Sequence, residues 1–116
     1  MPKEIISFGY RHGTPRPPIG ERFVMIDVRS CGFKRNPFHD RTLRYLRGTD
    51  VRVQEDVKKT PGFDVIYAKL RNALSPLPED TVVYLGCTGG HHRSVTLAIL
   101  LSKDLSVPCD HRDINK

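Results

Sequence analysis

The sequence predicts a single α/β domain over residues 1–116, with a short, largely parallel sheet flanked by helices. Apolar, β-prone segments at 4–10, 22–28 and 81–85 are typical of strands. The continuous apolar character of 22–28 predicts a strand buried on both faces. Segments with helical spacing alternate with these strands, which favours a parallel sheet. The length and the 38% hydrophobic content fit one folded domain.

The elements follow in order along the chain. Residues 11–20 hold three prolines and two glycines, which predicts a loop. The segment 41–50 predicts a short helix with Leu43 and Leu46 turned inward. Thr60 and Pro61 are expected as N-cap and first residue of a clearer helix. Its apolar stripe consists of Phe63, Ile66, Leu70, Leu74 and Leu77. A last helix is expected from Ser94 to about Leu105, and a last short strand within 107–114.

Positive charge is concentrated in one part of the chain. Between Arg29 and Lys59 there are nine Lys or Arg and four Asp or Glu residues, and this excess of five accounts for most of the net charge of +6. Such a segment suits an anionic partner, either a phosphorylated small molecule or nucleic acid. A solvated surface is the alternative for any single lysine.

Several other function classes are not supported. No apolar run approaches the roughly 18 residues that span a membrane, so no membrane partner is expected. Three widely spaced cysteines form no disulfide framework, which favours the reducing cytoplasm. The cysteines and histidines lack the spacing of a metal site, and we expect neither a metal nor another cofactor.

The most informative stretch is GCTGGHHRSV, residues 86–95, which we expect between the fourth strand and the last helix. Ligands of parallel α/β sheets bind at this position, beyond the carboxyl ends of the strands. Glycines let successive N–H groups turn towards one point, and a helix start adds free N–H groups. The stretch therefore predicts a phosphate-binding loop formed by Cys87, Thr88, Gly89, Gly90, His91, His92, Arg93 and Ser94. A purely structural glycine-rich turn is the alternative.

The same stretch fits the pattern C-x5-R-[ST] of the protein tyrosine phosphatases. In that chemistry Cys87 would attack phosphorus, Arg93 would hold the phosphate oxygens and Ser94 would assist the leaving thiolate. Gly86 stands where many such enzymes carry a histidine, and only Asp40 and Asp113 are candidate general acids. A small Cys-dependent phosphatase is therefore an alternative function, and a buried structural cysteine a third interpretation.

A second resemblance covers nearly the whole chain. Six segments occur in a fixed order: SFGYRHGTP (7–15), IDVR (26–29), NPFH (36–39), LRGTD (46–50), GCTGGHHRSV (86–95) and HRDINK (111–116). As an ordered set they resemble the C-terminal domain of the RapZ (YvcJ) family of RNase adapter proteins. That family's C-terminal domain senses glucosamine-6-phosphate, and the full-length proteins bind a small regulatory RNA. The resemblance implies a stand-alone sensor domain, because no P-loop motif of the family's N-terminal half is found.

The resemblance also implies roles for particular residues. A phosphorylated amino sugar would be held by the loop 87–94 together with Asp27, Arg29, His39 and Arg11. RNA would contact the basic region, for which we name Arg35, Arg41, Arg44 and Arg47; such contacts would be weakly specific and salt-dependent. A homodimer is a further implied arrangement. Asp27 has a structural alternative, since it could simply pair with Arg29.

Overall fold

Four parallel strands form the sheet in the computed structural model, which describes residues 1–32, 43 and 45–116. The strands are β1 (Glu4–Gly9), β2 (Arg22–Asp27), β3 (Thr81–Cys87) and β4 (Cys109–His111), in the order β2-β3-β1-β4. The predicted α/β class with a largely parallel sheet is therefore confirmed. Among the described strands, the one before the loop at 88–92 is the third, whereas the fourth was expected there.

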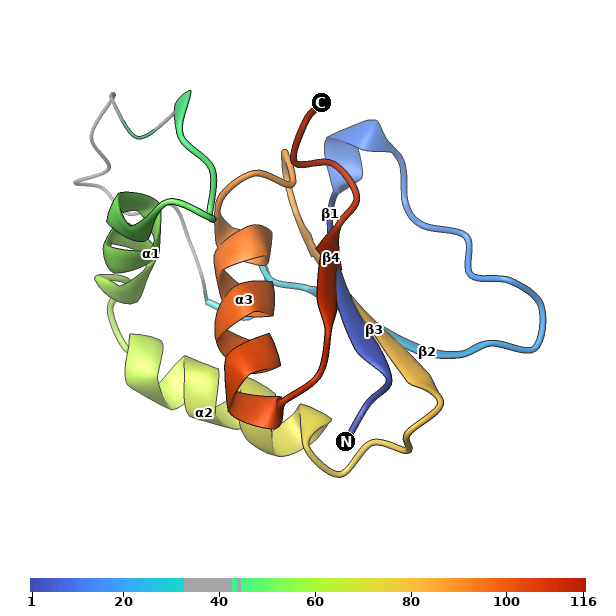
Figure 1. Ribbon diagram of the computed structural model, residues 1–116. Coiled ribbons are helices and arrows are strands. Elements are labelled where there is room, and N and C mark those ends of the chain that lie inside the picture. The colour runs from blue at the N-terminus through green and yellow to red at the C-terminus, as the bar shows by residue number, and fades with distance from the viewer. Residues whose placement is uncertain (33–42, 44) are drawn as a thin grey trace.

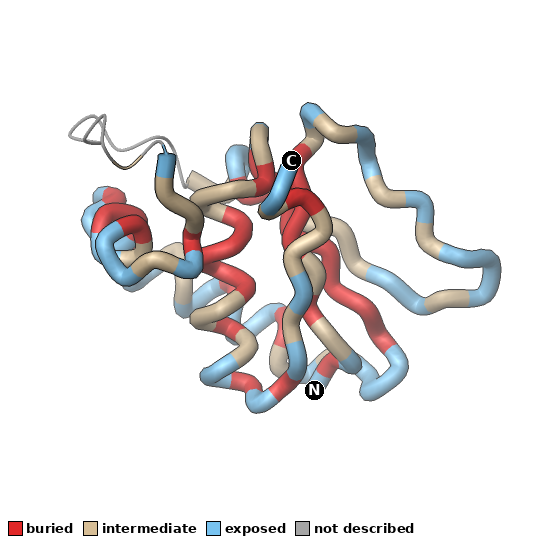
Figure 2. The backbone as a smooth tube through the Cα atoms, turned by 45° about the horizontal axis from the view of Figure 1, so that its top comes forward, coloured by how far each residue is buried: buried red, intermediate tan, exposed pale blue. Residues whose placement is uncertain are grey.

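The helices lie together on one side of the sheet (Figure 1). They are α1 (Val51–Lys58), α2 (Phe63–Leu74) and α3 (Arg93–Leu105), and a 3-10 turn, η1 (Tyr10–His12), follows β1. Alternation along β1 and β3 sends Ile5, Val83 and Leu85 towards these helices, where they join the main hydrophobic core. Phe8, Val82 and Tyr84 form a smaller cluster with other residues of the strands and η1. Figure 2 shows buried residues along β1, β3 and α3.

The central and outer strands differ in burial. Every residue of β3 is buried, as its continuous apolar sequence predicts. The same expectation for β2 is wrong: Arg22 and Phe23 are exposed and the rest of the strand is half-buried. The physical reason is position, because β2 is at the edge of the sheet and pairs only with β3 among the described strands.

Helix boundaries depart from the prediction at two places. α2 begins at Phe63 with Gly62 as N-cap in the left-handed region (φ 75°), so Thr60 is not the cap. Instead the Thr60 carbonyl accepts from the Phe63 N–H (2.9 Å) in a preceding turn. α3 begins and ends within one residue of the prediction.

α1 forms at residues 51–58, where the sequence pattern predicted no helix. The Asp50 carboxylate accepts from the Arg52 N–H (2.9 Å), a regular N-cap, and Val53 and Val57 are buried four residues apart. The short helix expected at 41–50 falls partly outside the described residues, and its described end, 46–50, is irregular. Leu43 and Leu46 do pack against the core as predicted.

Candidate functional site at the carboxyl end of the sheet

Three strands end at the same edge of the sheet and bring distant parts of the sequence together. Gly9 of β1 lies opposite Cys87 of β3, and Asp27 of β2 lies opposite Gly86. The loop 88–92 crosses this edge and leads directly into α3. His92, the N-cap residue of α3, gives no side-chain hydrogen bond to the first turn, so these N–H groups are not capped by it. The edge therefore combines a helix start with the ends of three strands.

The loop approaches β1 so closely that glycine is required on both sides. A Cβ at Gly9 would lie 2.3 Å from the Gly89 carbonyl carbon, and one at Gly90 would lie 2.6 Å from the Gly9 nitrogen. Gly90 also has a φ of 75°. The loop conformation is thus set by backbone contact with the end of β1, a constraint that no local pattern in the loop itself reveals.

Cys87 is buried beneath this loop. Its side chain is 3% exposed, and Sγ lies 3.1 Å from the Ser94 Oγ and accepts from the Gly90 N–H at 3.3 Å. The thiol therefore links the end of β3 to both the loop and the first turn of α3. A Cβ at the preceding Gly86 would lie 2.3 Å from the Phe8 ring, which explains why no larger residue precedes the cysteine.

Asp27 and Arg29 form a bidentate pair at the end of β2. Nε and Nη2 of Arg29 donate to the two carboxylate oxygens of Asp27, each at 2.9 Å, and the guanidinium lies 4.3 Å from the centre of the Tyr10 ring. Hydrogen bonds from Arg29 lower the pKa of Asp27, and the charge of Arg93 contributes. The pair therefore places a carboxylate and a guanidinium together at the carboxyl end of β2. Tyr10 is a participant that the sequence analysis did not name.

The C-terminal turn holds the loop from the other side. Asp113 is fully buried, and its carboxylate accepts from the Gly9 N–H at 2.8 Å and pairs with Arg112 (2.8 Å) and Lys116 (2.9 Å). Burial alone would raise the pKa of Asp113, but these hydrogen bonds outweigh it and the pKa is well below its usual range. Asp113 is thereby engaged as an anchor of Gly9, a role that sequence reasoning missed.

The two histidines of the loop have structural contacts. The His91 carbonyl accepts from the Gly48 N–H, and the His92 Nε2 lies 2.7 Å from the Leu46 carbonyl oxygen. A Cβ at Gly48 would lie 2.7 Å from the His92 carbonyl oxygen, so the LRGTD segment packs directly on the loop. Burial and the nearby charge of Arg47 lower the pKa of His91.

The other residues predicted to bind a ligand or RNA either contact other segments of the chain or lie outside the described residues. The Arg11 backbone N–H donates to the Thr88 carbonyl at 3.0 Å, which ties η1 to the loop. Arg47 Nε donates to the Ile114 carbonyl at 2.8 Å, so this predicted RNA contact supports the C-terminal turn. His39, Arg35, Arg41 and Arg44 lie outside the described residues, as does Asp40.

Two absences hold for the described part of the chain. There, no helix is long and apolar enough to cross a bilayer. Within residues 1–32, 43 and 45–116, no three or more His, Cys, Asp or Glu side chains lie together as metal ligands would.

Comparison with known proteins identifies the family. The model of the RapZ C-terminal domain matches residues 1–115. The chain belongs to the RapZ C-terminal domain family. A nucleotide-binding protein of Heliobacterium modesticaldum is 42% identical over 97% of this chain, and one of Limosilactobacillus reuteri is 38% identical over 97%. A third, of Halothermothrix orenii, is 36% identical over the whole chain.

This RapZ C-terminal domain spans about two-fifths of each of those relatives: 39%, 41% and 43% of their lengths, respectively. The family assignment confirms the resemblance carried by the six ordered segments of the sequence.

Proposed function

We propose that the domain binds a phosphorylated amino sugar, such as glucosamine-6-phosphate, at the carboxyl end of the sheet and acts as a regulatory sensor. The observation that carries this proposal is the Asp27–Arg29 pair at the end of β2, next to the end of β3, from which the loop 88–92 leads to Arg93 at the start of α3. Guanidinium groups and helix N–H groups favour a phosphate, whereas a carboxylate accepts from sugar hydroxyls or an ammonium group. An amino-sugar phosphate presents both kinds of group.

Each residue has a distinct role in this proposal. Arg93, Ser94 and the loop N–H groups hold the phosphate, and Asp27 receives the amine or hydroxyl. Arg29 keeps Asp27 ionised and oriented through its two 2.9 Å hydrogen bonds. The predicted contacts of His39 and Arg11 with the sugar remain part of the proposal; Arg11 adjoins the loop through its backbone.

Calorimetric titration with glucosamine-6-phosphate, glucose-6-phosphate and glucosamine tests this function. We expect saturable binding of the first, weaker binding of the second, and loss of the amine preference in Asp27→Asn. Arg93→Ala should weaken the binding of both sugar phosphates. Arg22→Ala, which removes an exposed pair with Asp80, serves as the matched control. Equal binding of all three compounds, or no effect of Arg93→Ala, would contradict the proposal.

RNA is a second proposed partner and is supported by charge and family. The basic region between Arg29 and Lys59 would contact RNA phosphates, so affinity should fall with rising salt. A gel shift with a single-stranded RNA at several salt concentrations tests this. Affinity independent of salt would contradict it, as would unchanged affinity after replacement of Arg35, Arg41 and Arg44 together by alanine.

A Cys-dependent phosphatase is the second candidate function, favoured by one observation. The Cys87 Sγ lies within hydrogen-bond distance of Ser94 and Gly90, as a C-x5-R nucleophile would. Its low exposure and the engagement of Asp113 weigh against turnover. Hydrolysis of an aryl phosphate that disappears in Cys87→Ser would establish this function; sugar-phosphate binding without hydrolysis in the same preparation would exclude it.

A further inference from the structure

A pocket lies between α2 and α3, on the helical side of the domain. Its volume is about 440 Å³, and α1 contributes Lys58 to its rim. The lining from α3 comprises Leu100, Lys103 and Asp104, which lie seven to eleven residues beyond Arg93. At 1.5 Å per residue this is roughly 10–17 Å along the helix axis, so the pocket is separate from the β3–α3 loop.

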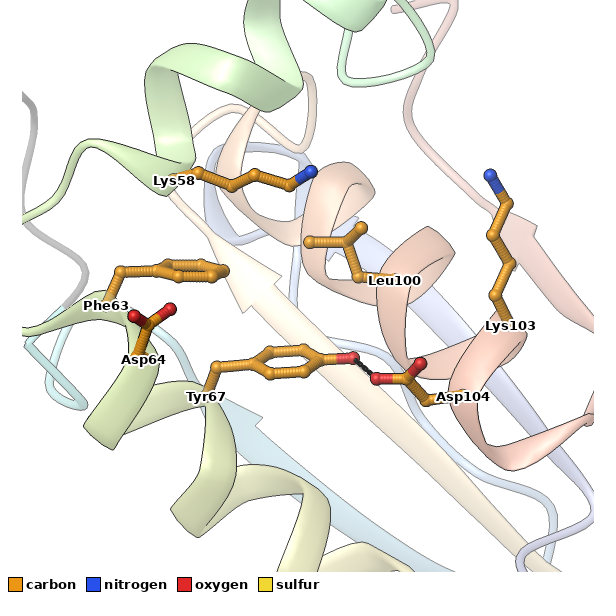
Figure 3. Close-up of a pocket in the computed structure, with 7 residues that line it drawn as sticks. All are labelled: Lys58, Phe63, Asp64, Tyr67, Leu100, Lys103 and Asp104. Carbon is orange, nitrogen blue, oxygen red and sulfur yellow. Dashed lines mark hydrogen bonds between the residues drawn. The ribbon is translucent and has the colours of Figure 1, made fainter.

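The pocket has a flat aromatic wall. The rings of Phe63 and Tyr67 are stacked, with centroids 5.5 Å apart and planes at 12°. Figure 3 shows the Tyr67 ring extending beyond Phe63 towards α3, with Leu100 across the space and the Lys58 stem on the other side of Phe63. A planar ring inserted here would contact the phenol face and Leu100.

One carboxylate in the pocket is held in a fixed position. The Tyr67 hydroxyl donates to Asp104 Oδ2 at 2.5 Å, and burial together with this bond raises the pKa of Tyr67. The phenol therefore stays protonated at neutral pH and keeps the carboxylate oriented. An ionised carboxylate offers about four acceptor positions, so Asp104 can still receive two donors from a ligand.

Ammonium groups complete the rim. Lys58 forms an exposed pair with Glu55 at 3.4 Å, and Lys103 follows Leu100 by one helical turn. The pocket thus presents a stacking surface, a two-acceptor edge and cationic donors. A ligand that fits this pocket is planar. It carries two adjacent N–H donors on the edge that faces Asp104 and acceptors on the neighbouring edge that faces a lysine.

Among the nucleobases, guanine has this arrangement. Its N1–H and N2–H groups suit one carboxylate, and its O6 and N7 acceptors suit a lysine. Adenine and cytosine present one amino group at their pairing edge, and uracil places carbonyl oxygens on both sides of its single N–H. We propose that the pocket between α2 and α3 binds a guanine base, from a free nucleotide or from single-stranded RNA, by stacking on Tyr67 and hydrogen bonding to Asp104.

Chemical-shift mapping and calorimetry with GMP, AMP, CMP and UMP test the base preference. We expect GMP to bind at least about tenfold more tightly than the others, with shifts centred on Tyr67 and Leu100. Tyr67→Ala and Asp104→Asn should each abolish the preference. Tyr67→Phe keeps the stacking ring but releases Asp104 from the Tyr67 hydroxyl, so the preference should be smaller than in the wild type but not lost. Asp80→Asn is the control for loss of an exposed acid elsewhere.

Two RNA pentamers, UUGUU and UUAUU, distinguish the sources of the base. Tighter binding of the guanine pentamer than of GMP indicates that RNA supplies the base; GMP binding as tight or tighter indicates a free nucleotide. Equal affinity for all four mononucleotides, or shifts confined to residues 86–95, would overturn the proposal. The two proposals fail separately: no shifts at Tyr67 and Leu100 with GMP would overturn the pocket, whereas no shifts in residues 86–95 with glucosamine-6-phosphate would overturn the sugar-phosphate site.

Discussion

The backbone N–H of Gly9 donates to the carboxylate of Asp113, which joins the end of the first strand to the last turn of the chain. The same Gly9 lies against Gly89 and Gly90 of the loop. A residue near the C-terminus therefore positions, through β1, the loop that we propose to hold phosphate. This connection joins the terminal segment to the central loop, two of the six segments that carry the resemblance to the family.

Replacement of Asp113 by asparagine should destabilise the domain. Asparagine can still accept from Gly9 but loses the ion pairs with Arg112 and Lys116, and we expect a loss of about 1–3 kcal/mol in the free energy of unfolding. Urea denaturation at pH 7 measures this. Asp110→Asn, in an exposed position, should change stability by less than about 0.5 kcal/mol.

Acid should weaken the same interaction. Because the folded-state pKa of Asp113 lies below its ordinary value of 3.8, its contribution is present at higher pH and is lost as pH falls below that value. The stability difference between wild type and Asp113→Asn should therefore be constant above about pH 5 and shrink under stronger acid. A difference that grows with acid would contradict this assignment.

Gly9→Ala should disturb the loop directly. The new Cβ would meet backbone atoms of the loop, which cannot rotate away, and we expect a loss of about 3 kcal/mol with weaker sugar-phosphate binding. Gly89→Ala is the matched comparison, since its Cβ would lie in ordinary contact, 3.8 Å from the His91 Nδ1. Equal thermal unfolding of the two variants would show that the close approach is not maintained in solution.

His91 should make the domain sensitive to mild acid. Burial and the charge of Arg47 lower its pKa from the ordinary 6.5, so the unfolded chain binds the proton at a higher pH than the folded one. Stability should consequently fall as pH decreases from about 7 to about 5. His91→Gln should show a smaller decrease over this range, and proton NMR of the wild type should give a His91 titration midpoint below 6.5. A midpoint above 6.5 would refute the sign.

Thiol labelling should separate the three cysteines. Cys31 and Cys109 are half-buried, whereas Cys87 is 3% exposed and hydrogen-bonded. In the native protein we expect two thiols to react with an aromatic disulfide reagent and the third to react only on unfolding. If Cys87→Ser instead removes the fastest-reacting thiol, the cysteine is accessible and the phosphatase candidate gains support.

Much of the fold could be predicted from local patterns. The strands at 4–9 and 81–87 and the helix from residue 93 have strong apolar periodicity, and their bounds agree with prediction within about two residues. α1 was missed because only two valines mark its buried face in an otherwise polar segment. The predicted start of α2 was wrong because Gly62, in a left-handed conformation, is the N-cap in place of Thr60.

The candidate site shows the same division between local pattern and tertiary contact. The glycines, Arg93 and Ser94 could be named from the sequence because their types and spacing indicate anion binding at a helix start. The pairing of Asp27 with Arg29 could also be predicted, because the two residues are only two positions apart in the chain. The packing of Gly9 on Gly90, and the burial of Asp113 beneath both, required the parallel pairing of β1 with β3 and β4.

The sequence by itself determined the α/β class, the family and the loop that forms the candidate site, because these depend on apolar periodicity and on residues close together in the chain. Only the tertiary structure decided which strand lies at the edge, that Cys87 is buried, and that Asp113 anchors Gly9. It also brought Tyr67 of α2 within hydrogen-bond distance of Asp104 of α3. The contacts Gly9–Asp113 and Tyr67–Asp104 join residues 104 and 37 positions apart, and such contacts form only when the sheet order and the helix packing are fixed together.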